Sequence, residues 1–445
     1  MNSKITLRWI IHPALCAGIL FAASGCGIYG SFKTPQYADT AEAYGGIESA
    51  DTTSTGDIGW REFFRDEQLR ALIDTALVRN ADLQVAGLRV EEAQASLRTA
   101  KLAFLPSFEL SPSATYDGSW YVQLPVSASW QIDLFGSLRN AKKGKLAAMM
   151  QSASYAQAVR TEMIATVATT YYTLLALDAQ QAVYEETERT WKQNVEAMRR
   201  LMQAGRYNAA SVQQTEADYC NVLNNLVNVR QQINETENRL CSLMGWTPRT
   251  VERGTFDAWT APETLRVGVP VRVLAARPDV RQAEFALAQS FYATTKVHLA
   301  MYPSLTVSGS YDFRHALYEA VGAMVMPLFR RGELRANLKI AKAQQAEAEA
   351  SFRQTLVDAG VEVNDAFIAV KCAREKSANY TVQIGHLEDA VKSTQLLMQH
   401  GSTTYLEVLT AQQSLLTAQI GQIANRLTEI SGTITLYEAL GGGLQ

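Results

Sequence analysis

The sequence has few of the residues from which catalytic and metal sites are usually built. Its 445 residues include only five cysteines and five histidines. The cysteines form no CxxC pair and the histidines have no metal-ligand spacing, so neither a disulfide framework nor a zinc site is indicated. There is also no glycine-rich phosphate loop. We therefore expect no enzyme, no metal and no cofactor.

Excess basic charge and long hydrophobic runs are absent as well. The net charge is −3, and removing the first 25 residues, with Lys4 and Arg8, leaves −5. This balance argues against nucleic acid as a partner, because nucleic acid selects a basic face. Beyond residue 25 no stretch has eighteen consecutive apolar residues, so we expect no transmembrane helix. With 47% hydrophobic residues the chain can still bury substantial surface.

The N-terminus has the pattern of an export signal. Two basic residues precede the apolar stretch 9–23, which indicates a signal peptide over residues 1–25. The stretch ends in Ala23-Ser24-Gly25-Cys26, which resembles a bacterial lipobox. The resemblance makes Cys26 the expected site of a covalent lipid; an ordinary signal peptide with a cysteine nearby is the alternative. Residues 26–60 lack periodicity and are predicted to form an extended, lipidated arm.

Proline is absent from residues 136–205, and glycine is rare there. Apolar residues recur every three or four positions, which predicts one helix over residues 137–203. At 1.5 Å per residue such a helix is about 100 Å long. A second helix is predicted to return over residues 206–244.

The same design occurs twice. Gly136-Ser137-Leu138-Arg139 returns as Gly332-Glu333-Leu334-Arg335, Gly205 returns as Gly401, and Leu240…Gly245 returns as Leu436…Gly441, all displaced by 196 residues. Leu105-Pro106-Ser107 returns as Tyr302-Pro303-Ser304, displaced by 197. The shared offset indicates an internal duplication. We expect a first repeat over 61–248, a connector over 249–269 and a second repeat over 270–445.

The second repeat is expected to copy the first, with a long helix over 333–399 and a return helix over 402–440. Both return helices show apolar residues in alternating steps of four and three, which predicts coiled-coil packing. These residues are Val222, Leu226, Val229, Ile233, Leu240 and Leu243, and Leu416, Ile420, Ile423, Leu427, Ile430 and Ile434. Shorter helices over 81–104 and 278–301 precede the prolines at 106 and 303.

Between each short helix and each long helix, apolar residues alternate with small polar ones. This period of two predicts a β-hairpin over residues 107–135, with a turn at 116–119, and another over residues 304–329. Pro112 and Pro125 fall inside the first hairpin, where each removes a ladder donor.

The strands carry the aromatic residues expected of strands that cross an outer membrane, namely Trp120, Tyr121, Trp130, Tyr311, Phe313 and Tyr318. Four strands cannot close a barrel, and open edges are not tolerated in lipid. The chain is therefore expected to pool its strands with other copies, and three copies give twelve strands. The alternative is a pair of hairpins that pack on helices in water.

The motifs together resemble the TolC-like outer-membrane factors (outer membrane efflux proteins), in the NodT-type lipoprotein branch that is associated with drug and metal efflux. The first-half motifs are Trp60-Arg61-Glu62-Phe63-Phe64, Asn80-Ala81-Asp82-Leu83, Leu105-Pro106-Ser107 and the run from Ser129 to Arg139. The second-half motifs are Arg277-Pro278-Asp279-Val280, Pro327-Leu328-Phe329, Gly332 and the run from Gly401 to Gln412. The resemblance covers nearly the whole mature chain.

The resemblance implies a mainly α-helical protein with a small membrane β part. Three copies would form a twelve-stranded outer-membrane β-barrel, continued by a long α-helical barrel in the periplasm. As the exit duct of a tripartite efflux system, this homotrimer would pass drugs or other small toxic compounds. Its implied partners are a periplasmic adaptor, an inner-membrane pump of the RND type and outer-membrane lipid, with no nucleic acid. The alternatives are the duct of a type I protein secretion system and a periplasmic coiled-coil structural lipoprotein.

The resemblance also assigns roles to single residues. Glu407 would line the periplasmic entrance, with Thr410 at the position where some members have a second acid; a surface glutamate is the alternative. Gly205, Arg206, Gly401 and Ser402 would form the helical tips that contact the adaptor, unless they are purely structural turns. The changes between barrel and helix would occur at Pro106, Gly136, Arg139, Pro303, Pro327, Gly332 and Arg335.

Overall fold

The computed structural model describes residues 31–35, 54–260, 266–268, 270–312, 317–326, 330–400 and 403–443. By their internal contacts the residues form two compact units. One unit, called the strand unit here, consists of Met1–Tyr37, Gly87–Tyr155 and Asp279–Thr355. The other, the helical unit, consists of Ala38–Ala86, Ala156–Pro278 and Leu356–Gln445. Each unit therefore takes residues from both sequence repeats.

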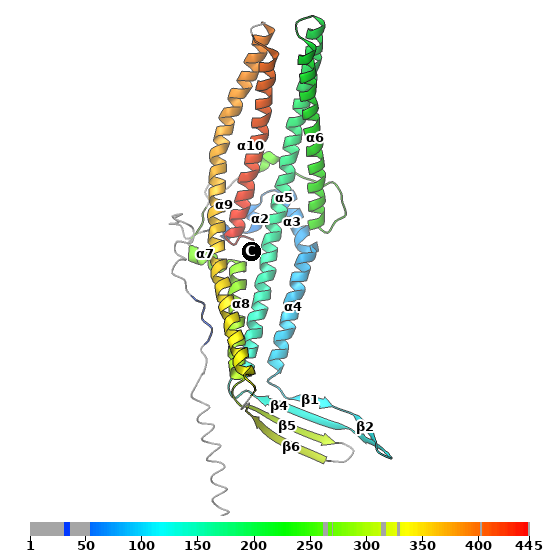
Figure 1. Ribbon diagram of the computed structural model, residues 1–445, viewed down its shortest axis with the longest axis vertical. Helices are drawn as coiled ribbons and strands as arrows, with labels where there is room; N and C mark the ends of the chain where they lie inside the picture. The colour runs from blue at the N-terminus through cyan, green and yellow to red at the C-terminus, as the bar shows by residue number, and fades with distance from the viewer. Residues whose placement is uncertain are drawn as a thin grey trace, which may run out of the picture. The chain divides into compact units, whose positions relative to one another are not determined.

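The strand unit contains a four-stranded antiparallel sheet, which Figure 1 shows with its strands side by side. Its strands are β1 (Ser107–Leu110), β4 (Pro125–Ile132), β5 (Ser304–Asp312) and β6 (Leu317–Val325), in the order β1-β4-β5-β6. The central pair β4 and β5 joins the two sequence repeats, with Pro125 opposite Asp312 and Ile132 opposite Leu305. Strands β1 and β6 have no further strand beside them among the described residues, so both edges of the sheet are open.

The first hairpin is broken rather than continuous over 107–135. Beyond β1 and β4 it goes on as a separate two-stranded ladder of β2 (Ser113–Tyr116) and β3 (Trp120–Gln123). The break lies at Pro112 and next to Pro125, because proline has no N–H to give to the ladder. Gly118, with φ of 72°, makes the predicted turn.

The hairpins also end earlier than expected. Strand β4 stops at Ile132 because the next residue, Asp133, turns away to cap a helix. In the second hairpin β6 stops at Val325, and Pro327 lies outside the described residues.

The long helices have the predicted bounds. Helix α5 spans Ser137–Gln203 and α9 spans Glu333–Gln399, each with 67 residues. The helices before the hairpins, α4 (Ala81–Leu102) and α8 (Pro278–Leu299), end two residues earlier than the sequence suggested. Each of α4, α5 and α9 contributes residues to both units.

The return helices begin three residues later than predicted. They are α6 (Ala209–Leu243) and α10 (Tyr405–Ala439), not 206–244 and 402–440. In the first, Asn208 is the N-cap, since its side-chain oxygen accepts a hydrogen bond of 2.9 Å from the backbone N–H of Ser211. Residues 206–208 are needed to reverse the chain, so they cannot be helical. Figure 1 shows α6 returning beside α5, and α10 beside α9.

Both return helices end in the same backbone motif. Gly245 and Gly441 have positive φ, of 63° and 83°. The residue after each donates its N–H five residues back, Trp246 to the carbonyl of Cys241 and Gly442 to that of Tyr437, both at 2.8 Å. This six-to-one hydrogen bond defines a Schellman motif, which glycine favours. The offset of 196 residues is therefore preserved in backbone conformation.

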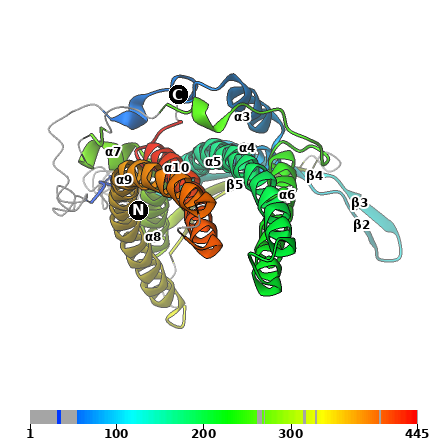
Figure 2. The ribbon, with the colours of Figure 1, turned by 90° about the horizontal axis from the view of Figure 1, so that it is seen from above.

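The core of the helical unit lies where short elements pack on the middle of α5 and the end of α10. These elements are α2 (Trp60–Phe63), α3 (Glu67–Arg79) and η3 (Phe256–Ala258), and Figure 2 shows α3 near α5. Tyr171 is fully buried; its hydroxyl donates to Asp66 at 2.8 Å and accepts from the N–H of Gly254 at 3.0 Å. Burial raises the pKa of this hydroxyl well above its usual range. Tyr171 therefore serves packing and hydrogen bonding as a neutral group.

The connector and the N-terminal arm are each held by specific contacts. Arg253 pairs with Asp178 of α5 at 2.6 and 3.0 Å and also with Glu237 of α6, which fastens the connector to that hairpin. In the strand unit, residues 31–35 have no regular secondary structure, and the Phe32 ring lies 5.8 Å from that of Phe291. Part of the predicted arm thus lies against α8.

In both repeats a side chain just before the short helix contacts the end of the return helix, but the two side chains differ. Asn80, just before α4, donates its Nδ2 to the carbonyl of Leu243 near the end of α6, at 3.1 Å. Arg277, just before α8, donates to the carbonyl of Ala439, the last residue of α10, at 2.7 Å. Arg277 also pairs with Glu362 of α9 at 2.6 Å. In the second repeat this contact therefore includes a third helix, α9, because the arginine side chain is longer than that of asparagine.

We expect Arg277→Ala to lower the free energy of unfolding of the helical unit by about 2–4 kcal/mol, because it leaves a buried carbonyl and a carboxylate without their donor. Urea unfolding followed by circular dichroism measures this. Arg281→Ala, at an exposed position one turn into α8, is the control and should stay within about 0.5 kcal/mol of the wild type. Equal midpoints for the two variants would contradict the role of Arg277.

Candidate functional site

The tip of the first helical hairpin is a tight turn around Gly205. This residue has φ of 72°, and Arg206 donates its N–H to the carbonyl of Leu201 at 3.0 Å, which is again a Schellman motif. The Arg206 side chain is exposed. The corresponding residues of the second tip, Gly401 and Ser402, lie outside the described residues.

Both predicted entrance residues are exposed on α10. Glu407 lies in the first turn, where the helix dipole favours an acid, and its carboxylate accepts a hydrogen bond from the Thr403 hydroxyl. Thr410 lies one turn further and donates its hydroxyl to the carbonyl of Leu406 at 2.9 Å. The structure thus places an accessible carboxylate beside the second tip.

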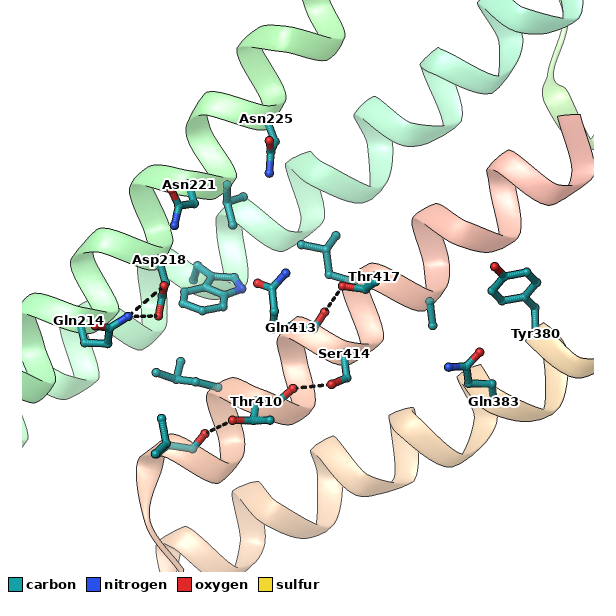
Figure 3. Close-up of a pocket in the computed structure, with 16 residues that line it drawn as sticks. Gln214, Asp218, Asn221, Asn225, Tyr380, Gln383, Thr410, Gln413, Ser414 and Thr417 are labelled. Atoms are coloured by element: carbon teal, nitrogen blue, oxygen red, sulfur yellow. Dashed lines mark hydrogen bonds between the residues drawn. The ribbon is translucent and has the colours of Figure 1, made fainter. Parts of the chain in front are cut away.

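Next to these residues, a groove of about 740 Å³ runs between the two hairpins of the helical unit. Helices α6 and α10 form its walls, Trp191 of α5 lines it between them, and two side chains come from α9 (Figure 3). Its polar lining residues are Gln214, Asp218, Asn221, Asn225, Tyr380, Gln383, Thr410, Gln413, Ser414 and Thr417. Thr410 is therefore a wall residue of the groove.

The groove is almost free of charge. Asp218 is its one charged lining residue, and the side-chain amide of Gln214 donates to both of its carboxylate oxygens at 3.2 Å. Along α10, no charged residue occurs between Glu407 and Arg426. Amides and hydroxyls can exchange hydrogen bonds with water and with many solutes, but they provide no activated nucleophile and no acid–base pair.

A half-buried polar contact joins the two hairpins of the helical unit. Asn194 of α5 donates its Nδ2 to Oε1 of Gln412 on α10 at 2.7 Å. Around it pack apolar side chains, including Trp191, which is 1% exposed, and Leu409. The Nε2 of Gln412 and the hydroxyl of Tyr405 are buried without a hydrogen-bond partner. Burial also raises the pKa of Tyr405, so this hydroxyl stays neutral.

In the strand unit, the change from strand to helix depends on glycine in both repeats. Gly136 and Gly332 have φ of 87° and 81°, a conformation that other residues rarely adopt. In the first repeat Asp133 caps α5, accepting from the backbone N–H of Leu138 at 2.9 Å and of Arg139 at 3.0 Å. The Arg139 guanidinium also pairs with this carboxylate, at 3.2 Å. Arg139 therefore holds the cap that starts the long helix.

The other predicted transition residues lie at the edges of elements. Pro106 directly precedes β1 and Pro303 directly precedes β5, as expected of residues that end a helix. Arg335 is exposed in the first turn of α9. Among the described residues there is no cluster of three or more potential metal ligands, and no described helix is long and apolar enough to span a membrane.

Three residues near these sites were not predicted. Asp133 had a signal in the sequence, since an acid shortly before a helix often caps it. Asn194 and Gln412 had none, because residues 218 positions apart reveal a contact only in the folded chain.

Comparison with known proteins gives consistent matches over both repeats. The family described as outer membrane efflux protein matches residues 72–246 and 269–442. The cation efflux system protein CusC of Escherichia coli is 25% identical over 451 residues, which cover 96% of this chain and 98% of CusC. The probable efflux pump outer membrane protein TtgC of Pseudomonas putida is 27% identical, covering 95% and 94%. A crystal structure of CusC superposes with a TM-score of 0.83 at 24% identity, covering 94% of this chain and 100% of that one.

Proposed function

The chain belongs to the outer membrane efflux protein family, and from this premise we propose that three copies form the exit duct of a tripartite efflux system. Drugs or other small toxic compounds pass through the duct from an inner-membrane pump and a periplasmic adaptor to the outside. The chain itself performs no chemistry. Family membership across both repeats, in a chain that covers its relatives almost from end to end, is the observation that carries the proposal.

The open edges of the sheet support the assembly. In lipid, the unpaired backbone groups of β1 and β6 cost several kcal/mol each unless another strand satisfies them. A second copy can offer its β6 to the β1 of the first, and a ring of three copies leaves no edge. The exposed aromatic side chains Phe108 and Trp120, 73% and 71% exposed, suit a lipid-facing surface.

The groove supports passive transport. In the assembly, the amide and hydroxyl walls of α6 and α10 face the interior of the duct, where they replace part of the hydration of a passing solute. A lining with a single charged side chain neither retains ions strongly nor excludes them. Such a surface accepts chemically different compounds, so selection among them falls to the pump. By the resemblance to the lipoprotein branch, that pump is of the RND type.

The proposal is tested with the purified, acylated chain. In mild detergent we expect the mass of a trimer, and in planar bilayers we expect ion conductance. In a Gram-negative host that lacks its own outer-membrane efflux channel but keeps the pump, the chain should reduce the accumulation of ethidium. A monodisperse monomer without conductance would refute the duct.

We also propose that Glu407 forms the selective ring at the periplasmic entrance, with Gly205, Arg206, Gly401 and Ser402 at the tips that meet the adaptor. Three copies place three carboxylates around the axis, which attract cations. Glu407→Gln should therefore reduce the cation-to-anion permeability ratio in planar bilayers by at least about threefold at low salt, where screening is weak. Glu388→Gln, at another exposed acid of the helical unit, is the matched control. Equal ratios in both variants would remove this assignment.

We propose further that Cys26 carries the covalent lipid that anchors the arm. This residue lies outside the described part of the chain, so the proposal depends on the lipobox-like sequence that precedes it. Metabolic labelling with palmitate should mark the wild type and not Cys26→Ser. The unlabelled variant should still form channels, because the strands themselves hold the chain in the membrane. Label that persists in Cys26→Ser would show that another residue is modified.

A further inference from the structure

Basic residues gather where the helices of the strand unit meet its strands. We call them the basic collar: Arg98 and Lys101 of α4, Arg139, Lys142, Lys143 and Lys145 of α5, Lys296 of α8, and Arg330, Arg331, Arg335, Lys339 and Lys342 at the start of α9. Residues 98–104, 133–145, 296–303 and 330–342 hold these twelve and only two acids, Asp133 and Glu333, for a net charge of +10. The rest of the chain has 29 basic and 42 acidic residues, a net charge of −13. The collar is therefore a strong local exception in an acidic chain.

The collar has little charge compensation within the described part of the chain. All twelve residues are exposed. The only ion pair that one of them makes there is that of Arg139 with Asp133. Lys142 lies 5.9 Å from the ring centre of Phe104, and Lys143 lies 5.6 Å from that of Tyr292, which leaves both ammonium groups accessible. Most of the positive charge is available to an external anion.

Intrahelical electrostatics do not account for the position of these charges. Cations at the ends of α4 and α8 agree with the helix dipole. Those at the starts of α5 and α9 oppose it, since a helix N-terminus favours acids. The first turn of α5 contains no acid at all, and that of α9 contains only Glu333. Arg139 and Arg335 lie in these first turns, where the dipole disfavours a cation, and seven further basic residues lie close to them in sequence. Since only Arg139 has an acidic partner among the described residues, an external anion is the natural compensation for this charge.

Aromatic side chains lie at the same junction. The indole N–H of Trp130, in β4, donates to the carbonyl of Phe104 at 2.9 Å, which places this ring at the end of α4. The rings of Phe135, between β4 and α5, and Tyr302, between α8 and β5, lie 5.4 Å apart. Tryptophan and tyrosine concentrate at the boundary between membrane and water, and basic residues just beyond them attract anionic lipid. The junction has both features.

We propose that the basic collar binds the phosphate groups of anionic phospholipids in the membrane leaflet at which the strands end. The inference rests on the membrane insertion that the proposed function requires. The collar adds a lipid preference to that function and fixes the depth at which the helices leave the membrane. Charge complementarity selects this occupant, because phospholipid head groups present a dense layer of phosphates beside the aromatic belt.

The test uses the full-length, acylated trimer in a neutral detergent, titrated with fluorescently labelled phosphatidylglycerol and phosphatidylcholine. The wild type should prefer phosphatidylglycerol at least about tenfold at 50 mM salt, and the preference should fall at 500 mM salt because of screening. Changing Lys142, Lys143, Lys339 and Lys342 to Gln should remove most of this preference. Changing the same lysines to Arg should retain it.

The control variant changes four exposed lysines of the helical unit, Lys192, Lys371, Lys376 and Lys392, to Gln. Its preference should equal that of the wild type. If the fourfold collar variant does not fold, the double variants Lys142→Gln/Lys143→Gln and Lys339→Gln/Lys342→Gln replace it, and each should lose part of the preference.

A wild type without preference for phosphatidylglycerol, or a collar variant that keeps this preference, would overturn the proposal. If the wild type conducts ions normally but shows no lipid preference, only the collar proposal fails. If the wild type does not conduct ions, the proposed duct function fails as well.

Discussion

Lipid provides no hydrogen bonds to a peptide backbone, and this constraint governs the whole assembly. Among the described residues the four-stranded sheet has two open edges, at β1 and β6, and such a sheet cannot be stable in a membrane alone. The pairing of β4 with β5 unites the strands of both repeats into one sheet, so each copy brings one continuous section of wall. A soluble coiled coil would need no such partner, and it would have no use for the strands.

Duplication has preserved the backbone more strictly than the side chains. The glycines that start the long helices and end the return helices keep positive φ in both repeats. Where the short helix meets the end of the return helix, however, Asn80 of one repeat corresponds to Arg277 of the other. Only the arginine also contacts the long helix, at Glu362. The acid beside the second tip, Glu407, has Ser211 as its counterpart in the first repeat. Shared backbone geometry gives a pseudo-symmetric wall, and divergent side chains give the two hairpins different roles.

The sequence predicted the long helices to the residue because glycines flank their ends at a repeated offset. It predicted the ends of the hairpins and return helices less well, because side-chain caps determine them. Strand β4 ends where Asp133 caps α5, and α6 begins only after its N-cap, Asn208. Pro112 and Pro125 indicated irregular strands, but they did not predict that the hairpin divides into two ladders. The contact of Asn194 with Gln412, and the grouping of collar charges from four helices, depend on tertiary structure and left no periodic signal. Family resemblance therefore supplied the function, while folding alone revealed how the parts are fixed.

The uncharged stretch of α10 between Glu407 and Arg426 has a hydrodynamic consequence. Fixed charge on a pore wall recruits counter-ions, and under a voltage these ions drag water with them. The α10 side of the wall, which presents amides and hydroxyls, recruits no such layer, so electro-osmotic flow along that side is weak. Compounds moving along this wall would then advance by diffusion, and the membrane potential of the cell would neither speed nor slow the neutral ones.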